Sequence, residues 1–290
     1  MDPNNPSLRS WIEVPADHDF PIQNLPFGVA RIPACGPRAV SRIGDTVINL
    51  AALAEWGFLD GTGIPGPGIF RHDILNPFMA LGKPVWRAVR KRLSELFEEE
   101  SGDIRDNAAA RSKILTPLSE VQMMMPVLVG DYTDFYASIE HATNVGKMIR
   151  DPENALLPNW KHLPVGYHGR SSSIVISGTD IHRPKGQRKP AESMTPVFGP
   201  STLLDFELEM AFVLGQGSSL GDRIPVDQAE EHIFGLVLFN DLSARDIQTW
   251  EYVPLGPFLG KNFGSVISPW IVTLDALEPF RVAGPDQDPP

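Results

Sequence analysis

The sequence predicts an α+β, mainly β protein, in which a small β-rich N-terminal domain precedes a larger second domain. The first indication is composition, because 25 glycines and 28 prolines in 290 residues are typical of many turns and short strands rather than of a helical bundle. The second is a change from short apolar pieces before residue 80 to longer strand-like runs beyond residue 120. We therefore expect domains at residues 1–119 and 120–290, divided just after the polar, alanine-rich segment 101–113.

The N-terminal domain is expected to contain short strands and one long helix. Residues 28–32 and 42–50 alternate like strands, with a Gly-Asp turn inside the second segment. Residues 85–99 carry apolar side chains at helical spacing, which predicts an amphipathic helix that faces the core.

The second domain shows two strand patterns. Residues 203–213 alternate, with apolar side chains on one face and Asp205, Glu207 and Glu209 on the other. Residues 233–239 form an apolar run that predicts a buried strand, and a helix is expected from about residue 240 through Trp250.

Charge and targeting signals exclude several classes of function. The formal net charge is −11, so no nucleic-acid or anionic-membrane partner is expected. No leader segment or membrane-spanning run is evident, and Cys35 is the only cysteine, so no intrachain disulfide can form. These features predict a cytoplasmic protein.

Two glycine-containing segments imitate nucleotide-binding motifs. Residues 61–66 match G-x-G-x-x-G by letters, but Pro65, Pro67 and Gly68 exclude the helix that a dinucleotide fold requires next. Gly260-Lys261 is followed by asparagine, so it is not a P-loop. No serine-hydrolase or zinc motif is present.

Acidic residues at strand ends are the strongest chemical signal. Glu207 and Glu209 share one strand face, and Asp241 ends the buried strand. Together with Asp134, these carboxylates suit a hard cation such as Ca²⁺ or Mg²⁺. The alternatives are a half-buried strand with a solvated acidic face, and helix N-capping by Asp134 and Asp241.

Basic and polar residues follow two of these acids at helical spacing. His141 lies seven residues after Asp134, and on a helix the two would share a face; the alternative is an ordinary structural histidine. Arg245 and Gln248 follow Asp241 in the same way, and an Asp–Arg pair within the helix is the alternative there. The aromatic and polar segment 159–170 favours a binding wall over a plain turn.

Several segments resemble the fumarylacetoacetase family. The Glu-x-Glu pair with a distal Asp indicates only the wider superfamily, whereas the first two of the following motifs are more specific. They are Asp-Tyr-Thr-Asp-Phe-Tyr at 131–136, His-Ala-Thr-Asn-Val-Gly at 141–146, Leu-Pro-Val-Gly-Tyr-His-Gly-Arg at 163–170, Asn-Asp-x-Ser-Ala-Arg-Asp-Ile-Gln at 240–248, and Pro-Leu-Gly-Pro-Phe-Leu-Gly-Lys at 254–261.

The resemblance implies a fold, a reaction and a homodimer. The fold is an SH3-like N-terminal barrel followed by a mixed β-roll catalytic domain. The reaction is hydrolysis of a C–C bond in the β-diketo acid 4-fumarylacetoacetate, giving fumarate and acetoacetate at the end of tyrosine and phenylalanine breakdown.

The resemblance also implies site residues. Ca²⁺ is held by Asp134, Glu207, Glu209 and Asp241, and Mg²⁺ lies in the region of Asp241, Lys261, Gly264 and Ser265. The base is His141, with Arg245, Gln248 and Lys261 stabilising developing charge. Substrate is contacted by Tyr136, Arg150, Tyr167, Gln248 and Tyr252.

Family members extend beyond the point where this sequence stops. The resemblance therefore implies a chain truncated at its C-terminus, with an incomplete β-roll and without the acidic partner of the base. Two alternatives stay open: an acylpyruvate hydrolase of the same superfamily, and a non-catalytic truncated product that acts as an interaction partner.

Overall fold

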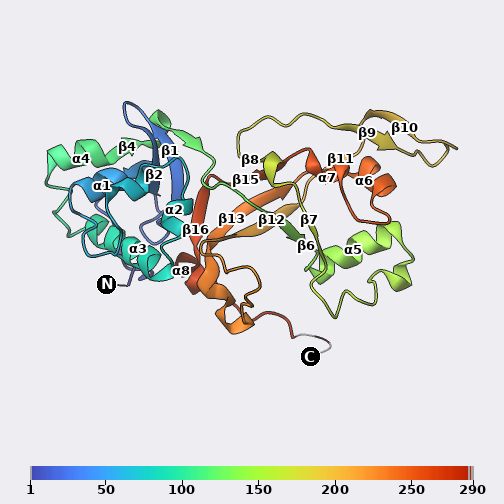
Figure 1. The fold of residues 1–290 in the computed structure, drawn as a ribbon. Helices are drawn as coiled ribbons and strands as arrows, with labels where there is room; N and C mark the ends of the chain where they lie inside the picture. The colour runs from blue at the N-terminus through green and yellow to red at the C-terminus, as the bar shows by residue number, and fades with distance from the viewer. Residues whose placement is uncertain (1, 287, 289–290) are drawn as a thin grey trace.

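The computed structural model describes residues 2–286 and 288, and its architecture is mainly β with short helices (Figure 1). The N-terminal part contains β1 (Phe27–Ile32), β2 (Gly36–Ile43), β3 (Thr46–Asn49), α1 (Leu50–Glu55), α2 (Asn76–Met79), α3 (Lys83–Phe97), α4 (Ala108–Ile114), β4 (Leu115–Pro117) and β5 (Gln122–Met124).

The second part has more strands. Its elements are β6 (Thr133–Phe135), α5 (Ile139–Ile149), β7 (Gly166–His168), β8 (Ile174–Ile176), β9 (Lys185–Arg188), β10 (Val197–Pro200), β11 (Leu204–Asp205), β12 (Leu208–Leu214), β13 (Ile233–Asp241), β14 (Ser243–Ala244), α6 (Arg245–Glu251), α7 (Leu259–Asn262), β15 (Ser265–Ile267), β16 (Trp270–Thr273) and α8 (Leu274–Leu277). Short 3-10 turns cover Pro67–Phe70, Leu118–Glu120, Pro152–Asn154, Ser171–Ser173, Val226–His232 and Glu278–Phe280.

One sheet joins the two parts of the chain. Its strand order is β4-β3-β2-β1-β16-β13-β15-β8, with β12 paired to β13 and β5 paired to β1. Strand β1 pairs with β16 through Phe27 and Gly28 and with β5 through its following residues. A Cβ at Gly28 would lie 2.9 Å from both the Pro269 carbonyl oxygen and the Trp270 ring, so the junction needs glycine at this position.

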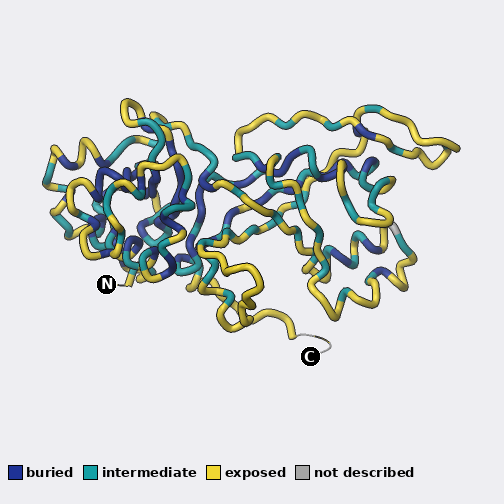
Figure 2. Tube along the Cα trace, in the orientation of Figure 1, coloured by how far each residue is buried: buried dark blue, intermediate teal, exposed yellow. Residues whose placement is uncertain are grey.

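The main core lies in the N-terminal part, where buried segments concentrate in Figure 2. Phe234 of β13 packs against three aromatic residues of that part, with ring centroids 5.6 Å from Phe27, 5.9 Å from Phe78 and 5.0 Å from Trp86. Burial of large aromatic side chains is a major source of stability. This cluster therefore anchors β13, which also carries Asp241, to the N-terminal core.

Most expected elements of the first domain are confirmed. The segment 28–32 is β1, the segment 42–50 contains the end of β2, a turn and β3, and the helix expected at 85–99 is α3. The buried side of α3 carries Trp86, Val89, Leu93, Leu96 and Phe97, as its periodicity predicts. The glycine-rich segment 61–66 forms turns rather than a dinucleotide-binding unit.

The strand expected at 203–213 is wrong in two respects. It is divided into β11 and β12, and its polarity is inverted: Leu208 is 79% exposed and Phe212 57% exposed, whereas Glu207 and Glu209 are half-buried. The alternative of a solvated acidic face is wrong for Glu207 and Glu209, because ion pairs and neighbouring carboxylates surround them, whereas Asp205 is exposed.

The capping alternatives are also corrected. Asp134 lies in β6, Asp241 ends β13, and the N-cap of α5 is Ser138, whose side chain accepts the His141 N–H. Asp134 and His141 therefore do not share a helix face. Arg245 pairs with Asp205 and Glu207 across the fold rather than with Asp241 along the helix, because Asp241 still belongs to a strand.

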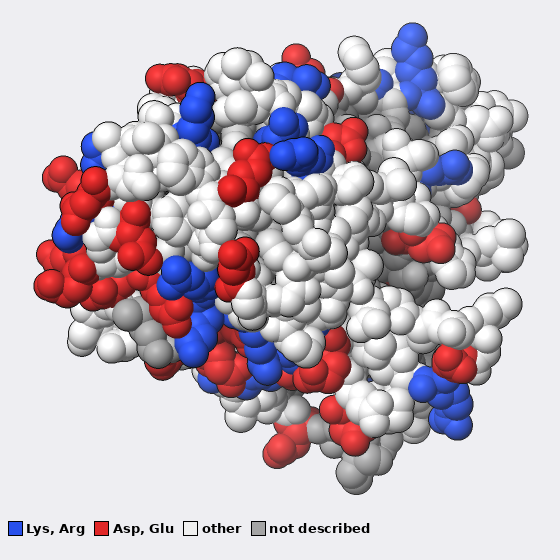
Figure 3. All heavy atoms as spheres, turned by 60° about the vertical axis from the view of Figure 1, so that its left-hand side comes forward, with Lys and Arg blue, Asp and Glu red and all other residues white. Residues whose placement is uncertain are grey.

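Charges of both signs are interspersed on the face shown in Figure 3, and acidic side chains gather most densely at its left edge. Within the described residues, no helix is long and apolar enough to cross a membrane.

Candidate active site

Three carboxylates from three different strands meet at one end of β13. Asp134 comes from β6, Glu209 from β12 and Asp241 from β13, and one oxygen of each lies within 4.8 Å of the others. We call these residues the acidic triad. The pairing of β12 with β13 brings two of them together, and the pairing of β6 with β7 supports the third. Oxygen donors at this spacing fit a hard divalent cation.

The fourth predicted ligand, Glu207, lies beside the triad and binds cationic side chains. Its Oε1 accepts from Arg245 Nη2 at 2.7 Å, and its Oε2 accepts from Lys261 Nζ at 2.7 Å. The same Nζ donates to Asp241 Oδ2 at 2.6 Å. Lys261 therefore links Glu207 to the triad, and its ammonium group offsets part of the acidic charge.

Burial and mutual repulsion shift the ionisation of these acids. Burial raises the pKa of Glu209 to about 8, and the charge of Asp134 adds to this shift. Burial also raises the pKa of Asp241 to about 6, even though Lys261 opposes the shift. For Glu207, Lys261 and Arg245 outweigh burial and hold the pKa well below its usual range. The triad thus carries unfavourable negative charge that a cation would relieve.

Arg245 and Gln248 form one unit on α6. Arg245 Nη1 donates to Gln248 Oε1 at 3.0 Å, and Arg245 Nε donates to Asp205 Oδ2 at 2.9 Å. Two carboxylates and one amide therefore fix the guanidinium near Glu207. Burial disfavours the charged form, but the hydrogen bond to Glu207 leads the interactions that raise the pKa of Arg245.

His141 faces the site from α5. Its Nε2 lies 3.7 Å from Glu207 Oε1, and its ring stands edge-on to Tyr136 with centroids 5.6 Å apart. The side chain of His141 is 40% exposed, so water and small molecules can reach the imidazole. His141 therefore lies beside the carboxylate of Glu207, and it does not share a helix face with Asp134.

The other predicted residues differ in how close they stand to the triad. Tyr167 donates its hydroxyl to Asp241 Oδ2 at 3.3 Å, and Ser265 donates to Asp241 Oδ1 at 3.4 Å. Tyr136 donates its hydroxyl to the Ala142 carbonyl, and Arg150 Nη1 donates to the Ala155 carbonyl. Within the segment 159–170, Tyr167 reaches the triad, whereas Trp160 donates to the Tyr136 carbonyl and Lys161 pairs with Asp288. Among the described side chains, Tyr252 makes no hydrogen bond to the triad, and Gly264 packs against Ile181.

The sequence matches known proteins over most of its length. Residues 23–126 match the sequence profile of the fumarylacetoacetase N-terminal domain, and residues 131–284 match that of the fumarylacetoacetate hydrolase C-terminal domain. A fumarylacetoacetase of Arabidopsis thaliana is 55% identical over 98% of this chain, and that of Caenorhabditis elegans is 53% identical over 97%. The chain spans 68% of the length of each of these two relatives.

The chain belongs to the fumarylacetoacetase family. The human fumarylacetoacetase is 52% identical over 97% of this chain, which covers 67% of that relative. Among solved structures, a fumarylacetoacetate hydrolase from psychrophilic Exiguobacterium antarcticum is 18% identical, with a TM-score of 0.46 over 87% of this chain and 67% of that one.

One tyrosine of this family member was not assigned a role from the sequence. Tyr132 donates its hydroxyl to Asp134 Oδ2 at 3.4 Å and packs on Phe239 with ring centroids 5.3 Å apart. Burial raises the pKa of Tyr132, and the neighbouring charge of Asp241 adds to the shift, so the phenol stays protonated and can donate. The i, i+2 spacing of Tyr132 and Asp134 is the signal that could have found it, because such residues share a strand face.

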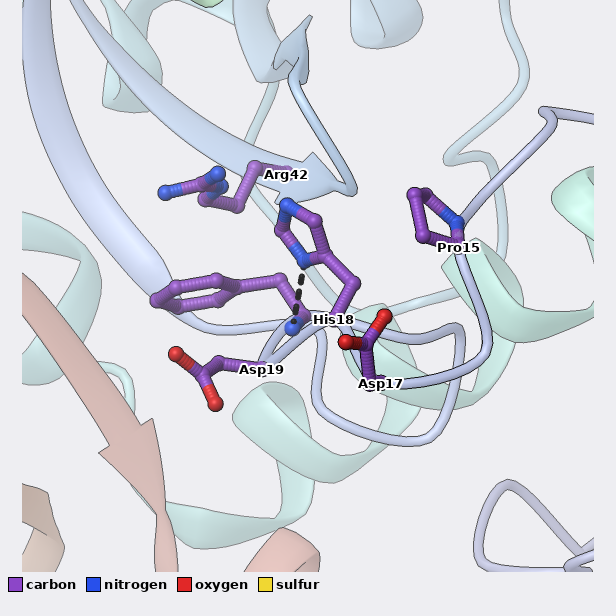
Figure 4. A pocket seen from close by; sticks show the side chains of 6 residues that line it. Pro15, Asp17, His18, Asp19 and Arg42 are labelled. Atoms are coloured by element: carbon purple, nitrogen blue, oxygen red, sulfur yellow. Dashed lines mark hydrogen bonds between the residues drawn. The ribbon is translucent and has the colours of Figure 1, made fainter.

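An open depression of about 420 Å³ lies in the N-terminal part and involves none of the predicted site residues. Figure 4 shows that Arg42 and the loop containing His18 form its walls. Arg42 lies 3.9 Å from the Phe20 ring centroid and donates to the Gly44 carbonyl and to Asp45. The Phe20 N–H donates to His18 Nδ1. These contacts indicate that the polar groups hold the 15–20 loop against β2.

The ionisation of the triad predicts that binding of a divalent cation such as Ca²⁺ depends on pH. Glu209 and Asp241 have higher pKa values in the folded chain, about 8 and about 6, than unfolded carboxyl groups have. The metal-free native state therefore binds more protons than the unfolded state, and its stability decreases as pH rises toward 8. A cation must displace these protons, so we expect the increase in Tm caused by Ca²⁺ to be larger at pH 8.5 than at pH 5.5.

Thermal unfolding with Ca²⁺ and with EDTA at both pH values measures this difference. In the metal-free protein, the Glu209→Gln variant, which cannot titrate at this position, should lose part of the decrease in Tm between pH 5.5 and pH 8.5, and Asp241 accounts for the rest. An equal Ca²⁺ effect at the two pH values in the unmodified chain would contradict the expectation.

Proposed function

We propose that this chain hydrolyses the C–C bond of 4-fumarylacetoacetate, the last step of tyrosine and phenylalanine breakdown, with a divalent cation at the acidic triad. The observation that supports this most strongly is the meeting of Asp134, Glu209 and Asp241 within 4.8 Å in a member of the fumarylacetoacetase family. The reaction makes the protein a hydrolase that acts on carbon–carbon bonds.

Ca²⁺ is the cation proposed at the triad, with Glu207 beside it. A bound divalent cation would polarise the attacked carbonyl group and stabilise the enolate that leaves. Carboxylate oxygens at partly buried positions fit such an ion. A Mg²⁺ site is proposed next to Asp241, near Gly264 and Ser265. Lys261 belongs to this region as a neighbouring cation, because a charged ammonium group has no lone pair for a metal.

His141 is proposed as the general base. Neutral imidazole can take a proton from water near pH 7, and the resulting hydroxide forms a bond to the attacked carbonyl carbon. The C–C bond then breaks, its electron pair stays on the acetoacetate fragment, and a proton completes that product. Glu207, 3.7 Å from His141 Nε2, supports the imidazolium, since a nearby carboxylate stabilises the protonated ring.

Arg245, Gln248 and Lys261 are proposed to stabilise the developing negative charge, as preorganised donors do in water-excluded sites. Lys261 is buried, and the mutual contact of Arg245 and Gln248 fixes both side chains. Substrate contacts are proposed for the following side chains: Tyr136, Arg150, Tyr167, Gln248 and Tyr252.

Finer features of the fold and assembly belong to the same proposal. They are a domain boundary near residue 120, an SH3-like first domain, a β-roll second domain, a homodimer and a cytoplasmic location. The homodimer is supported by exposed apolar side chains on the outer face of β12 and β13, including Leu208, Met210, Phe212 and Leu238. A standard interface buries on the order of 800 Å² of each partner, and apolar side chains of this kind would contribute to it. The exposed free thiol of Cys35 suits a reducing compartment.

The proposed activity is tested by the loss of diketone absorbance when the purified chain meets fumarylacetoacetate. We expect turnover with Ca²⁺ and Mg²⁺, its removal by EDTA and its return with added Ca²⁺. An acylpyruvate under the same conditions should react more slowly. A folded chain without turnover would contradict the proposal and favour the role of a non-catalytic interaction partner, whereas faster cleavage of the acylpyruvate would reassign the substrate.

A further inference from the structure

The carboxylate of Glu251, the last residue of α6, accepts three consecutive backbone N–H groups at the start of α7. Phe258 and Gly260 donate to its Oε1 at 2.8 Å and 2.7 Å, and Leu259 donates to its Oε2 at 2.9 Å. Hydrogen bonds to a charged acceptor are stronger than those between neutral groups. The turn at residues 258–260 is therefore attached firmly to the end of α6.

This turn leads directly into Lys261. The Lys261 N–H donates to the Phe258 carbonyl at 3.1 Å, so the backbone that Glu251 holds is also the backbone from which the lysine side chain projects. At the other end of that side chain, Nζ lies 2.7 Å from Glu207 Oε2 and 2.6 Å from Asp241 Oδ2. A shift of the turn would thus move the ammonium away from both carboxylates.

The packing of α7 on α6 depends on the same turn. A Cβ at Gly260 would lie 2.8 Å from Gln248 Cβ and 2.9 Å from Gln248 N, so the two backbones touch at this point. Gln248 also binds Arg245. The turn therefore connects Lys261 to α6, the helix that bears Arg245 and Gln248.

Much of the segment between α6 and α7 is exposed to solvent. Val253, Leu255 and Phe258 expose most of their side chains, and Leu255 is 95% exposed. Because Phe258 and Leu259 are also exposed, water can replace the carboxylate at their N–H groups if Glu251 is removed. The expected consequence is a local loosening of the turn rather than unfolding of the chain.

We propose that Glu251 is a positioning residue that holds Lys261 between Glu207 and Asp241 by fixing the turn at residues 258–260. The importance of this position for catalysis rests on the proposed function, but the placement of Lys261 does not. The two are therefore tested separately.

Amine acetylation followed by mass spectrometry tests the placement in the metal-free chain. In the unmodified protein, exposed Lys185 should react rapidly, whereas buried Lys261 and buried Lys83 should be protected. In Glu251→Ala, Lys261 should react severalfold faster while Lys83 stays protected. Lys83 is paired with Glu231 at a distant site, so it reports whether the whole fold is intact.

Two further variants sharpen the comparison. Glu251→Gln keeps the side-chain volume and one acceptor oxygen, so the reactivity of Lys261 should lie between the unmodified and alanine forms. Glu192→Ala, which removes an exposed carboxylate elsewhere, should change nothing. If Lys83 also becomes reactive in the alanine variant, the whole fold has loosened. The acetylation rate of Lys261 relative to that of Lys83 in the glutamine variant then tests the proposal. Unchanged protection of Lys261 in a folded Glu251 variant would overturn the proposal.

Kinetics test whether Glu251 acts through Lys261. Glu251→Ala should lower kcat by about 10- to 100-fold, the range for residues that orient a functional group, with little change in KM. Adding Glu251→Ala to Lys261→Met should lower kcat no further than Lys261→Met alone, because the two residues then act through one interaction. Independent, multiplicative losses, or a rise in KM alone, would overturn the proposal and point to the adjacent Tyr252.

Discussion

Replacing His141 with alanine is expected to abolish turnover of fumarylacetoacetate while leaving Ca²⁺ binding intact. The loss should reach about 10²- to 10⁴-fold, the usual contribution of a positioned general base. Ca²⁺ binding should persist because Arg245 and Lys261 hold Glu207 without help from the imidazole, and because His141 is not among the three residues of the triad.

The measurement combines the absorbance assay with calorimetric titration of Ca²⁺. His72→Ala is the matched control, since His72 is an exposed histidine of the N-terminal part. Retained turnover in His141→Ala would exclude the base role. Loss of Ca²⁺ affinity together with turnover would instead make His141 part of the metal site.

Replacing Asp241 with asparagine is expected to remove Ca²⁺ binding and turnover together. Asp241 is 1% exposed and contacts Lys261, Tyr167 and Ser265, so it links the triad to much of the surrounding site. Asparagine preserves the shape but removes the charge that binds a cation. Ca²⁺ affinity should decrease by more than the roughly 10- to 100-fold that supporting residues typically contribute.

Calorimetry and the Ca²⁺-dependent change in Tm measure this effect. Asp222→Asn, on an exposed turn, is the matched control and should bind Ca²⁺ as the unmodified chain does. Unchanged Ca²⁺ affinity in a folded Asp241→Asn variant would show that the cation binds elsewhere.

Local patterns predicted several elements well. Helix α3 was expected because its apolar side chains repeat with the period of one buried helix face. Strand β13 was expected from its apolar run, although Leu238 on its outer face is 58% exposed. The acidic residues were expected from the resemblance and from their places at strand ends. In each case the information lies within a short stretch of chain, so no distant contact is needed to recognise it.

Other local predictions failed where distant partners decide the outcome. Asp134 and His141 were expected on one helix face, but β6 pairs with β7, and this pairing places Asp134 in a strand. A pair of Asp241 with Arg245 along one helix was the alternative for this arginine, but its carboxylate partners are Asp205 and Glu207. Strand pairing and ion pairing between remote segments override local spacing, because their geometry is set only when the chain folds.

The sequence alone determined the family, the mainly β class and the identity of the carboxylates, because motifs and periodicity are local properties. Only the tertiary structure decided which carboxylates meet, that Glu207 binds Lys261 and Arg245 instead of joining the triad, and that Glu251 holds the turn before Lys261. It also decided that the apolar face of β12 is the exposed one. The physical reason is that ion pairs, burial and pKa shifts depend on distances between residues far apart in the chain, which folding alone brings to a few ångströms.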